Sequence, residues 1–150
     1  MALEKLTRSD LIFRDVEADD IKDLLRFIAT RMGERGVVDD PEHLYRRLWE
    51  REQLGSTGVG SGVAIPHCKM SGVAGVVLAV ATVPEGIDFG AVDGQPVHLV
   101  FVIVSPSKST TEHLQSLAEV SKWVKSDRRV ERVLRLETSE ELYELLAEEG

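Results

Sequence analysis

Two stretches of this chain, residues 75–83 and 97–104, are apolar almost without interruption. Strands that read this way usually belong to a sheet that is covered on both faces. The shorter segment Val63 to Ile65 runs into Pro66 and also reads as a buried strand, while Leu11 to Val16 alternates loosely and could open the sheet. The pattern therefore predicts a sheet with helices packed on each of its faces.

Helical periodicity separates these strands. Residues 19–33 carry apolar side chains at three- and four-residue steps and begin with two aspartates, either of which can cap a helix. A second helix is expected to start at Asp40-Pro41, because aspartate suits the N-cap and proline suits the first helical position. This helix runs toward Arg51, which lies just before a glycine-rich loop.

Three more helices are expected after residue 106. The first would turn inward a face made of His113, Leu117, Val120 and Val124. His113 would then lie in a first helical turn that follows the C-terminal end of a strand, where anions bind favourably. A short helix would present a solvated face of Arg128, Arg129, Arg132 and Arg135. The last begins with a capping box, Thr138 with Glu141, and runs toward Gly150.

The candidate chemistry is concentrated in residues 55–70, GSTGVGSGVAIPHCKM. Four glycines let the loop adopt positive φ and bring its amides close to an anion, and Pro66 restricts the approach to His67. An imidazole on a stiff strand end beside N–H donors suits a nucleophile that attacks phosphorus. The loop lacks the GK[ST] ending of a nucleotide-binding P-loop, so ATP is not indicated.

Each candidate residue also has a purely structural interpretation. Outside its motif, His67 would be an ordinary loop histidine, and His113 could be a core residue at the edge of an apolar helix face. Arg51 could cap the last carbonyls of its helix, a favourable place for a cation. His43 and His98 show no metal-ligand spacing with the single cysteine, so we interpret both as structural or surface groups and expect no metal site.

Composition narrows the classes of function. The formal net charge is −8, which argues against nucleic acid because phosphate backbones attract clusters of Lys and Arg. No segment is long and apolar enough to cross a membrane, the N-terminus does not resemble a signal segment, and one cysteine cannot form an internal disulfide. We therefore expect a single cytoplasmic domain over residues 1–150, without membrane insertion.

Two blocks of the sequence carry a family resemblance. The first is Arg51-Glu52 followed by GSTGVGSGVAIPH, and the second is PEGIDFGAVDGQPVHLVFVIVSP with EHLQSLAEV after it. Together they resemble the enzyme IIA domain of the bacterial phosphoenolpyruvate:sugar phosphotransferase system, in its fructose/mannitol/nitrogen-regulatory branch. The resemblance implies an α/β fold, a three-layer sandwich in which a mixed, mostly parallel sheet is flanked by helices.

The same resemblance implies a phosphotransferase with a phosphohistidine intermediate. Neutral His67 would take the phosphoryl group from the histidine-containing phosphocarrier protein and yield it to a IIB partner or to water. Arg51 and His113 would position the group and neutralise its charge, because the transition state is loose and spreads charge over its oxygens. The loop residues expected to bind the phosphate are Ser56, Thr57 and Gly58. No cofactor or metal is required.

Three functions remain open for this chain. It could be a sugar-transport enzyme IIA, a nitrogen-type regulator that binds target proteins, or a binding module that kept the fold without the chemistry. The resemblance begins near the first residue and ends with the chain, without a fused IIB, IIC or carrier domain, which favours the regulator. The presence of His67, Arg51 and His113 speaks against the third. Cys68 stands where the family usually has a small residue, and its role stays open.

Overall fold

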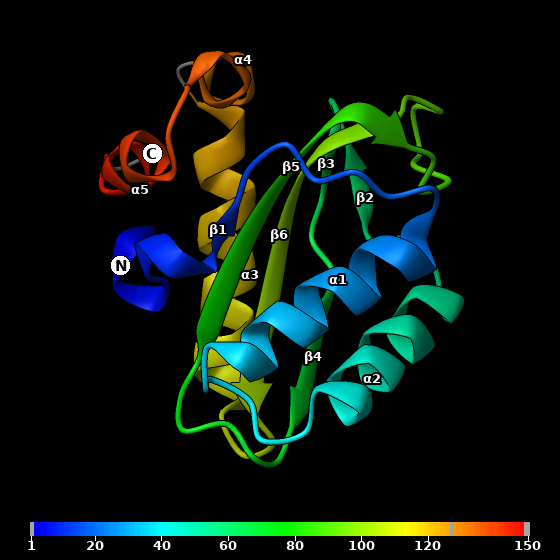
Figure 1. Cartoon of the computed structure of the whole chain (residues 1–150), viewed down its shortest axis with the longest axis vertical. Helices are drawn as coiled ribbons and strands as arrows, with labels where there is room; N and C mark the ends of the chain where they lie inside the picture. Colours follow the sequence, from blue (N-terminus) through cyan, green and yellow to red (C-terminus); the bar gives the residue numbers. More distant parts are fainter. Residues whose placement is uncertain (1, 127, 149–150) are drawn as a thin grey trace.

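The centre of the fold is a pair of long antiparallel strands, β5 (Val77–Ile87) and β6 (Val97–Pro106), seen in the computed structural model of Figure 1. The structure describes residues 2–126 and 128–148. Met1, Asp127, Glu149 and Gly150, where the last helix was expected to end, lie outside the described residues. Within the described residues the sheet has six strands in the order β1-β5-β6-β3-β2, and β4 pairs with β6.

The other strands are short. They are β1 (Ile12–Phe13), β2 (Gly58–Gly60), β3 (Val63–Ala64) and β4 (His67–Met70). The α-helices are α1 (Ile21–Glu34), α2 (Pro41–Gln53), α3 (Thr110–Lys125), α4 (Arg129–Arg135) and α5 (Ser139–Leu146). Two 3-10 turns, η1 (Leu3–Leu6) and η2 (Ser9–Leu11), precede β1. The sheet is mixed, because β1–β5, β3–β6 and β4–β6 are parallel pairs and β2–β3 and β5–β6 are antiparallel.

Helices cover the sheet on both faces, so the fold is the three-layer α/β sandwich that was expected (Figure 1). Along β6, alternate side chains serve opposite layers. Val100, Val102 and Val104 pack with α1 and α2. Leu99, Phe101 and Ile103 pack with α3, α4 and α5. Because successive side chains of a strand point to opposite faces, a strand between two helical layers must be apolar at every position.

The helices begin at the capping residues predicted for them. Asp20 and Asp40 each accept a hydrogen bond from the backbone N–H three residues further on, and Pro41 occupies the first turn of α2. Thr138 and Glu141 form both hydrogen bonds of a capping box. Each such cap satisfies backbone N–H groups that the helix leaves unpaired and typically contributes about 1 kcal/mol.

Two strands differ most in extent from the predictions. The opening strand, expected from Leu11 to Val16, is limited to Ile12–Phe13, because Leu11 ends a 3-10 turn and Asp15 has a left-handed backbone with φ 56°. The strand expected over residues 75–83 begins at Val77 and continues to Ile87. The apolar run in the sequence coincides with the buried part of β5. The continuation after Val83 includes exposed residues, which the hydrophobic pattern did not indicate as a strand.

The prediction of a solvated arginine face is wrong for Arg129, which is only 2% exposed. Its guanidinium carbon lies 4.8 Å from the centroid of the Trp123 ring, and its Nη1 donates to the Trp123 carbonyl at 3.4 Å. Trp123 itself belongs to the core beneath α3. A planar guanidinium stacks well on an indole, so this arginine covers a buried aromatic ring instead of facing water.

The inward face of α3 was predicted in part. Its buried residues are His113, Ser116, Val120 and Trp123. Leu117 and Val124, expected on this face, are only partly buried at its margin. The buried stripe is therefore rotated slightly from the predicted one, although His113 keeps its place in the first turn.

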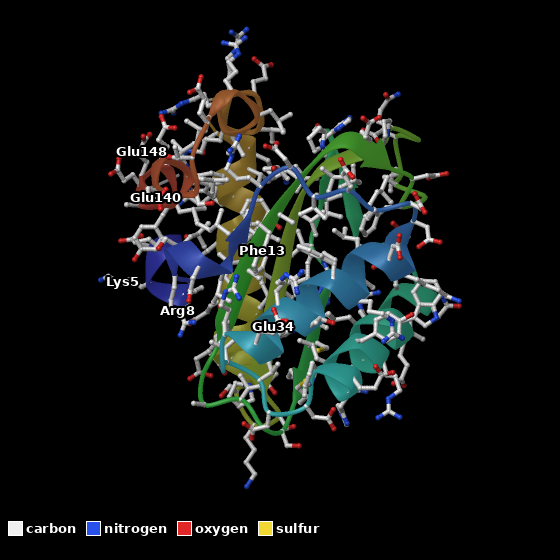
Figure 2. All side chains as sticks on the ribbon, in the orientation of Figure 1. Lys5, Arg8, Phe13, Glu34, Glu140 and Glu148 are labelled. Carbon is white, nitrogen blue, oxygen red and sulfur yellow. The ribbon has the colours of Figure 1, made fainter. Side chains whose placement is uncertain are left out.

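The periphery of the molecule is charged (Figure 2). Lys5, Glu140 and Glu148 are exposed and project outward, whereas Phe13 lies inside and packs edge-on against Phe27 with ring centroids 5.7 Å apart. Among the described residues, the helices are too short or too polar to span a membrane.

Candidate functional site

A break in one edge of the sheet sets the position of His67. β3 and β4 pair in parallel with the same edge of β6, at Leu99–Val100 and at Ile103–Pro106. Ile65 and Pro66 lie between them, and proline has no N–H for the ladder, so the strand is interrupted there. His67 was expected at the end of the strand over residues 63–65, and it is instead the first residue of β4, directly after the break.

The hydrogen bonds of His67 define which nitrogen is free to react. Nδ1 lies 2.8 Å from the carbonyl oxygen of Ile65. A carbonyl can only accept, so in the neutral ring Nδ1 carries the proton and Nε2 keeps its lone pair. Arg51 donates from Nε to this Nε2 at 3.3 Å, which agrees with that tautomer.

Burial favours the neutral form of the His67 imidazole. Desolvation is the main cause that lowers the pKa of His67 from its usual value, and the positive charge of Arg51 lowers it further. The hydrogen bond to Ile65 and the charge of Glu52 oppose this shift without reversing it. The imidazole therefore has an available lone pair at neutral pH, as nucleophilic attack requires.

His113 lies beside His67, as predicted. The two ring centroids are 5.5 Å apart with the planes tilted by 54°. His113 is 5% exposed, and its Nδ1 lies 2.7 Å from the hydroxyl oxygen of Ser105, at the end of β6. The pKa of His113 is lowered to about 4, mainly by burial and to a smaller extent by the neighbouring His67 and Lys69. The ring is therefore neutral at pH 7 and held in one orientation.

A cavity of about 490 Å³ opens onto the two histidines, at the end of the sheet where β4 lies between α2 and α3 (Figure 1). Its lining includes the cations Arg47, Arg51 and Lys69 and the carboxylate Glu50. Three cations against one carboxylate make this cavity positive in a chain whose net charge is −8. Such a local excess of cations fits a phosphoryl dianion.

Sequence reasoning missed three of these neighbours, Arg47, Lys69 and Ser105. Lys69 is two residues beyond His67 on β4 and so shares its face of the strand. Its Nζ donates to the Thr110 hydroxyl at 3.0 Å, at the start of α3. Arg47 precedes Arg51 by one helical turn and donates to the Lys69 carbonyl at 3.1 Å. The two-residue spacing from His67 to Lys69 and the four-residue spacing from Arg47 to Arg51 are visible in the sequence, and they could have predicted that both cations lie near the site.

The polar groups of the glycine-rich loop form hydrogen bonds within the protein and do not line the cavity. The backbone N–H and the hydroxyl of Thr57 both donate to the buried carboxylate of Glu52, at 2.8 and 2.6 Å. The N–H of Gly58 donates to the Ser56 hydroxyl, which in turn donates to the Phe89 carbonyl. Among the described residues, the cavity lining does not include Ser56, Thr57 or Gly58. Phosphate binding by this loop stays a prediction, and it would require these bonds to break.

The chain matches the family model "Phosphoenolpyruvate-dependent sugar phosphotransferase system, EIIA 2" over residues 5–149. It belongs to this family. A nitrogen regulatory protein of Pseudomonas aeruginosa is 35% identical over 127 residues, which cover 85% of this chain and 82% of the relative. A fructose-specific EIIA component of Haloferax volcanii is 36% identical over 124 residues, covering 83% and 80%. The chain is thus an EIIA-type phosphoryl carrier.

Solved structures agree with the fold of this EIIA domain. The nitrogen regulatory protein IIA-Ntr of Neisseria meningitidis superposes with a TM-score of 0.86 at 30% identity, covering 95% of this chain and 97% of that one. A complex of enzyme IIA mannitol with phosphorylated enzyme IIB mannitol from Escherichia coli contains a chain with TM-score 0.80 at 24% identity, covering 95% and 99%. The second likeness concerns the fold alone. It also documents that an EIIA domain can pair with a IIB domain.

Cys68 is expected to be dispensable in this EIIA domain. As predicted from strand geometry, its side chain turns away from that of His67 into the core that packs with α1 and α2. Burial raises the pKa of the thiol to about 12, so it stays protonated and a poor nucleophile. Cys68→Ala should keep single-turnover phosphoryl transfer within about twofold and lower the free energy of unfolding by about 1 kcal/mol. Loss of all transfer in a folded Cys68→Ala protein would show that the thiol takes part.

The buried neutral His113 predicts acid-sensitive stability. Above pH 6.5, the ordinary imidazole pKa, the folded and unfolded chains both hold His113 neutral and its contribution is complete. As pH falls from 6.5 toward about 4, the unfolded chain binds the proton first, so the free energy of unfolding decreases by up to about 3 kcal/mol. Urea unfolding at several pH values should show a shallower decrease for His113→Gln. Parallel pH profiles for the two proteins would contradict the assignment.

Proposed function

We propose that this EIIA domain carries a phosphoryl group on Nε2 of His67, received from the histidine of a phosphocarrier protein in the cytoplasm. The observation that supports this most directly is the bond from Nδ1 to the Ile65 carbonyl, because it leaves Nε2 as the basic nitrogen beside Arg51. In the transfer, a bond forms between Nε2 and phosphorus while the bond between phosphorus and the donor nitrogen breaks. The donor imidazole keeps that electron pair.

The neighbours of His67 are suited to a loose transition state, in which charge spreads over the equatorial oxygens. Arg51 can shift its N–H from Nε2 to a phosphoryl oxygen without leaving the cavity. Its Nη1 is already held by the Gly55 carbonyl at 2.8 Å, so the guanidinium is fixed before the substrate arrives. We assign Lys69 and Arg47 a supporting electrostatic role and His113 direct contact with the phosphoryl oxygens.

Incubation with phosphoenolpyruvate, enzyme I and the phosphocarrier tests this assignment. The product should be acid-labile and base-stable, and ¹⁵N spectra of the labelled imidazole should place phosphorus on Nε2. A phosphate on Nδ1 would require the Ile65 bond to break and would contradict the proposed geometry.

We further propose that the domain acts chiefly as a nitrogen-type regulator. The similarity to IIA-Ntr supports this, although the fructose-specific relative is equally similar in sequence. Phosphorylation adds roughly 1.5–2 negative charges at neutral pH to a cavity rim that now carries Arg47, Arg51 and Lys69. Such a loss of local positive charge can release one partner protein or recruit another.

A pull-down with the unmodified and the phosphorylated domain tests the regulatory role. At least one protein outside sugar transport should be recovered from one state only, and His67→Ala should behave as the unmodified state. The second candidate function is transfer to a IIB protein, favoured by the fructose-specific relative. Rapid transfer to a sugar-specific IIB protein, with no partner that distinguishes the two states, would replace regulation with transport.

A further inference from the structure

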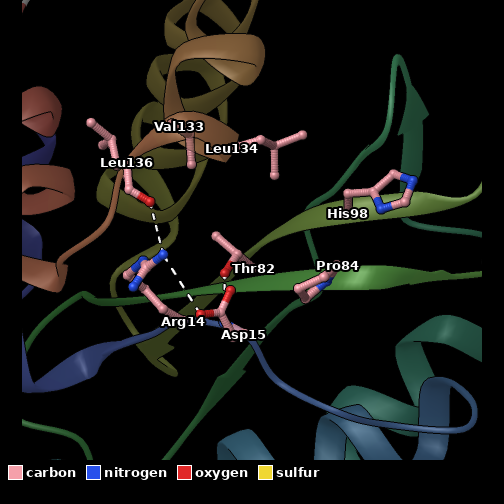
Figure 3. A pocket seen from close by; sticks show the side chains of 8 residues that line it. All are labelled: Arg14, Asp15, Thr82, Pro84, His98, Val133, Leu134 and Leu136. Carbon is pink, nitrogen blue, oxygen red and sulfur yellow. Dashed lines mark hydrogen bonds and ion pairs between the residues drawn. The ribbon is translucent and has the colours of Figure 1, made fainter.

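Figure 3 shows the residues that line a second cavity, of about 340 Å³. It lies toward the opposite end of the sheet from His67. Thr82, in its wall, pairs with Leu99 of β6, whereas His67 pairs with Ile103, four residues along the same strand. This separation is about 13 Å along the strand. The cavity is therefore distinct from the phosphoryl-transfer site, although α3 and the segment after it extend from one to the other.

Arg14 closes one side of this cavity with its donors already engaged. Its two Nη groups donate to the backbone carbonyls of Leu136, at 2.8 Å, and of Glu137, in the segment between α4 and α5. The same guanidinium lies 3.6 Å from the carboxylate of Asp15. Because these acceptors occupy the ends of the guanidinium fork, Arg14 is poorly placed to take an anionic ligand as well.

Asp15 offers the cavity a carboxylate. Its backbone lies in the left-handed region, with φ 56°, and its N–H donates to the Thr82 hydroxyl at 2.8 Å. The next N–H, of Val16, donates to the Thr82 carbonyl at 2.8 Å, so both bonds hold this unusual conformation in place. The Asp15 side chain is 63% exposed, and its ion pair with Arg14 is long, which leaves the carboxylate oxygens accessible to a second cation.

The remaining walls of the cavity provide a hydrogen-bond acceptor on His98 and an apolar surface from Pro84 and Leu134. Nδ1 of His98 lies 3.0 Å from the Val83 carbonyl, so in the neutral ring Nδ1 donates and Nε2 is an acceptor. Pro84 and Leu134 supply apolar surface between His98 and Asp15, as Figure 3 shows, and Leu134 is 46% exposed. A complementary ligand therefore donates hydrogen bonds, carries positive charge and has an apolar body.

We propose that this cavity binds a small primary amine with an apolar body, its ammonium on the Asp15 carboxylate and its body against Pro84 and Leu134. The ammonium replaces water beside a carboxylate whose ion pair with Arg14 is long, and Leu134 loses exposed apolar surface. This binding does not depend on the phosphoryl transfer proposed above.

Three probes of equal length and different charge test the proposal. n-Pentylamine, 1-pentanol and pentanoate are titrated into the ¹⁵N-labelled protein at pH 7 and followed by backbone amide shifts. Pentylamine should give saturable shifts around Asp15, Thr82 and Leu134 and bind about tenfold more tightly than pentanol, as expected for hydrogen bonds to a charged group. Pentanoate should give no saturable shift there.

The matched variants are Asp15→Asn and Glu17→Gln. Asparagine also tolerates the left-handed backbone, so Asp15→Asn removes the charge without straining the turn. It should weaken pentylamine binding about tenfold, whereas Glu17→Gln removes a charge two residues away and should leave binding unchanged. Equal affinity for pentylamine and pentanol, preference for pentanoate, absence of saturable shifts, or an unchanged affinity in Asp15→Asn would each overturn the proposal.

Discussion

Replacing His67 with alanine is expected to reduce phosphate incorporation from the phosphocarrier by more than about a thousandfold, because the variant lacks the attacking nitrogen. The loss should occur without unfolding. His67 is half-buried at the start of a short strand, and its removal leaves the β4–β6 backbone pairing intact. Transfer of radiolabelled phosphate from phosphoenolpyruvate, measured together with far-UV circular dichroism, separates loss of chemistry from loss of structure.

His43→Ala is the matched control for that experiment. His43 lies in the first turn of α2, and its backbone N–H, not its ring, takes part in the Asp40 cap. The His43→Ala variant should incorporate phosphate to the same extent as the protein without a substitution. If His67→Ala still accepts a stoichiometric phosphate, the assignment of the nucleophile is wrong.

Removal of Arg51 or of His113 is expected to slow single-turnover transfer by about a hundredfold each, by analogy with the loss of one donor from an oxyanion hole. Arg51 donates to Nε2 of His67, the proposed reacting nitrogen, and the His113 ring lies 5.5 Å from that of His67, so both can contact the transferred group. Quenched-flow measurement of Arg51→Ala and His113→Ala against the phosphorylated phosphocarrier gives the two rates. The two effects should not be additive, because both residues act on the same oxygens.

Two further variants distinguish catalysis from support of the fold. Arg51→Lys keeps a charge but loses the bond from Nε to Nε2, so it should recover only part of the rate. Ser105→Ala removes the hydroxyl that orients His113 and should reduce the rate less than His113→Ala does. Unchanged rates in Arg51→Ala and His113→Ala would show that both residues are structural.

Much of the site was predictable because its parts are local. The Ile-Pro-His triplet places an imidazole where a strand is interrupted, and Asp40-Pro41 starts a helix that must bring Arg51 to its last turn. His113 follows from the length of β6 and the loop after it. Lys69 and Arg47 follow the same rules, two residues along a strand and one turn along a helix, and could have been predicted as well.

The hydrogen-bond partners of the glycine-rich loop, residues 55–62, could not be predicted from local spacing. Glycines at positions 55–62 show that the backbone can turn, and Gly55, Gly60 and Gly62 do adopt positive φ. They do not show where the turned amides point. The buried carboxylate of Glu52, one helical turn before the loop, takes both donors of Thr57. A charged acceptor inside the protein competes directly with an incoming phosphate for the same N–H groups.

By itself, the sequence determined the layers of this protein and the starts of α1, α2 and α5, since each depends on spacing within one element or one turn. It also singled out His67 as the candidate nucleophile. Only the tertiary structure decided which nitrogen of His67 is free, that Arg129 covers Trp123, and that Arg14 binds the segment after α4 beside Asp15 at a second cavity. Those contacts join residues through packing of separate elements. Side-chain periodicity specifies which face an element buries, but the partner on that face is set by sheet register and by the space left between layers.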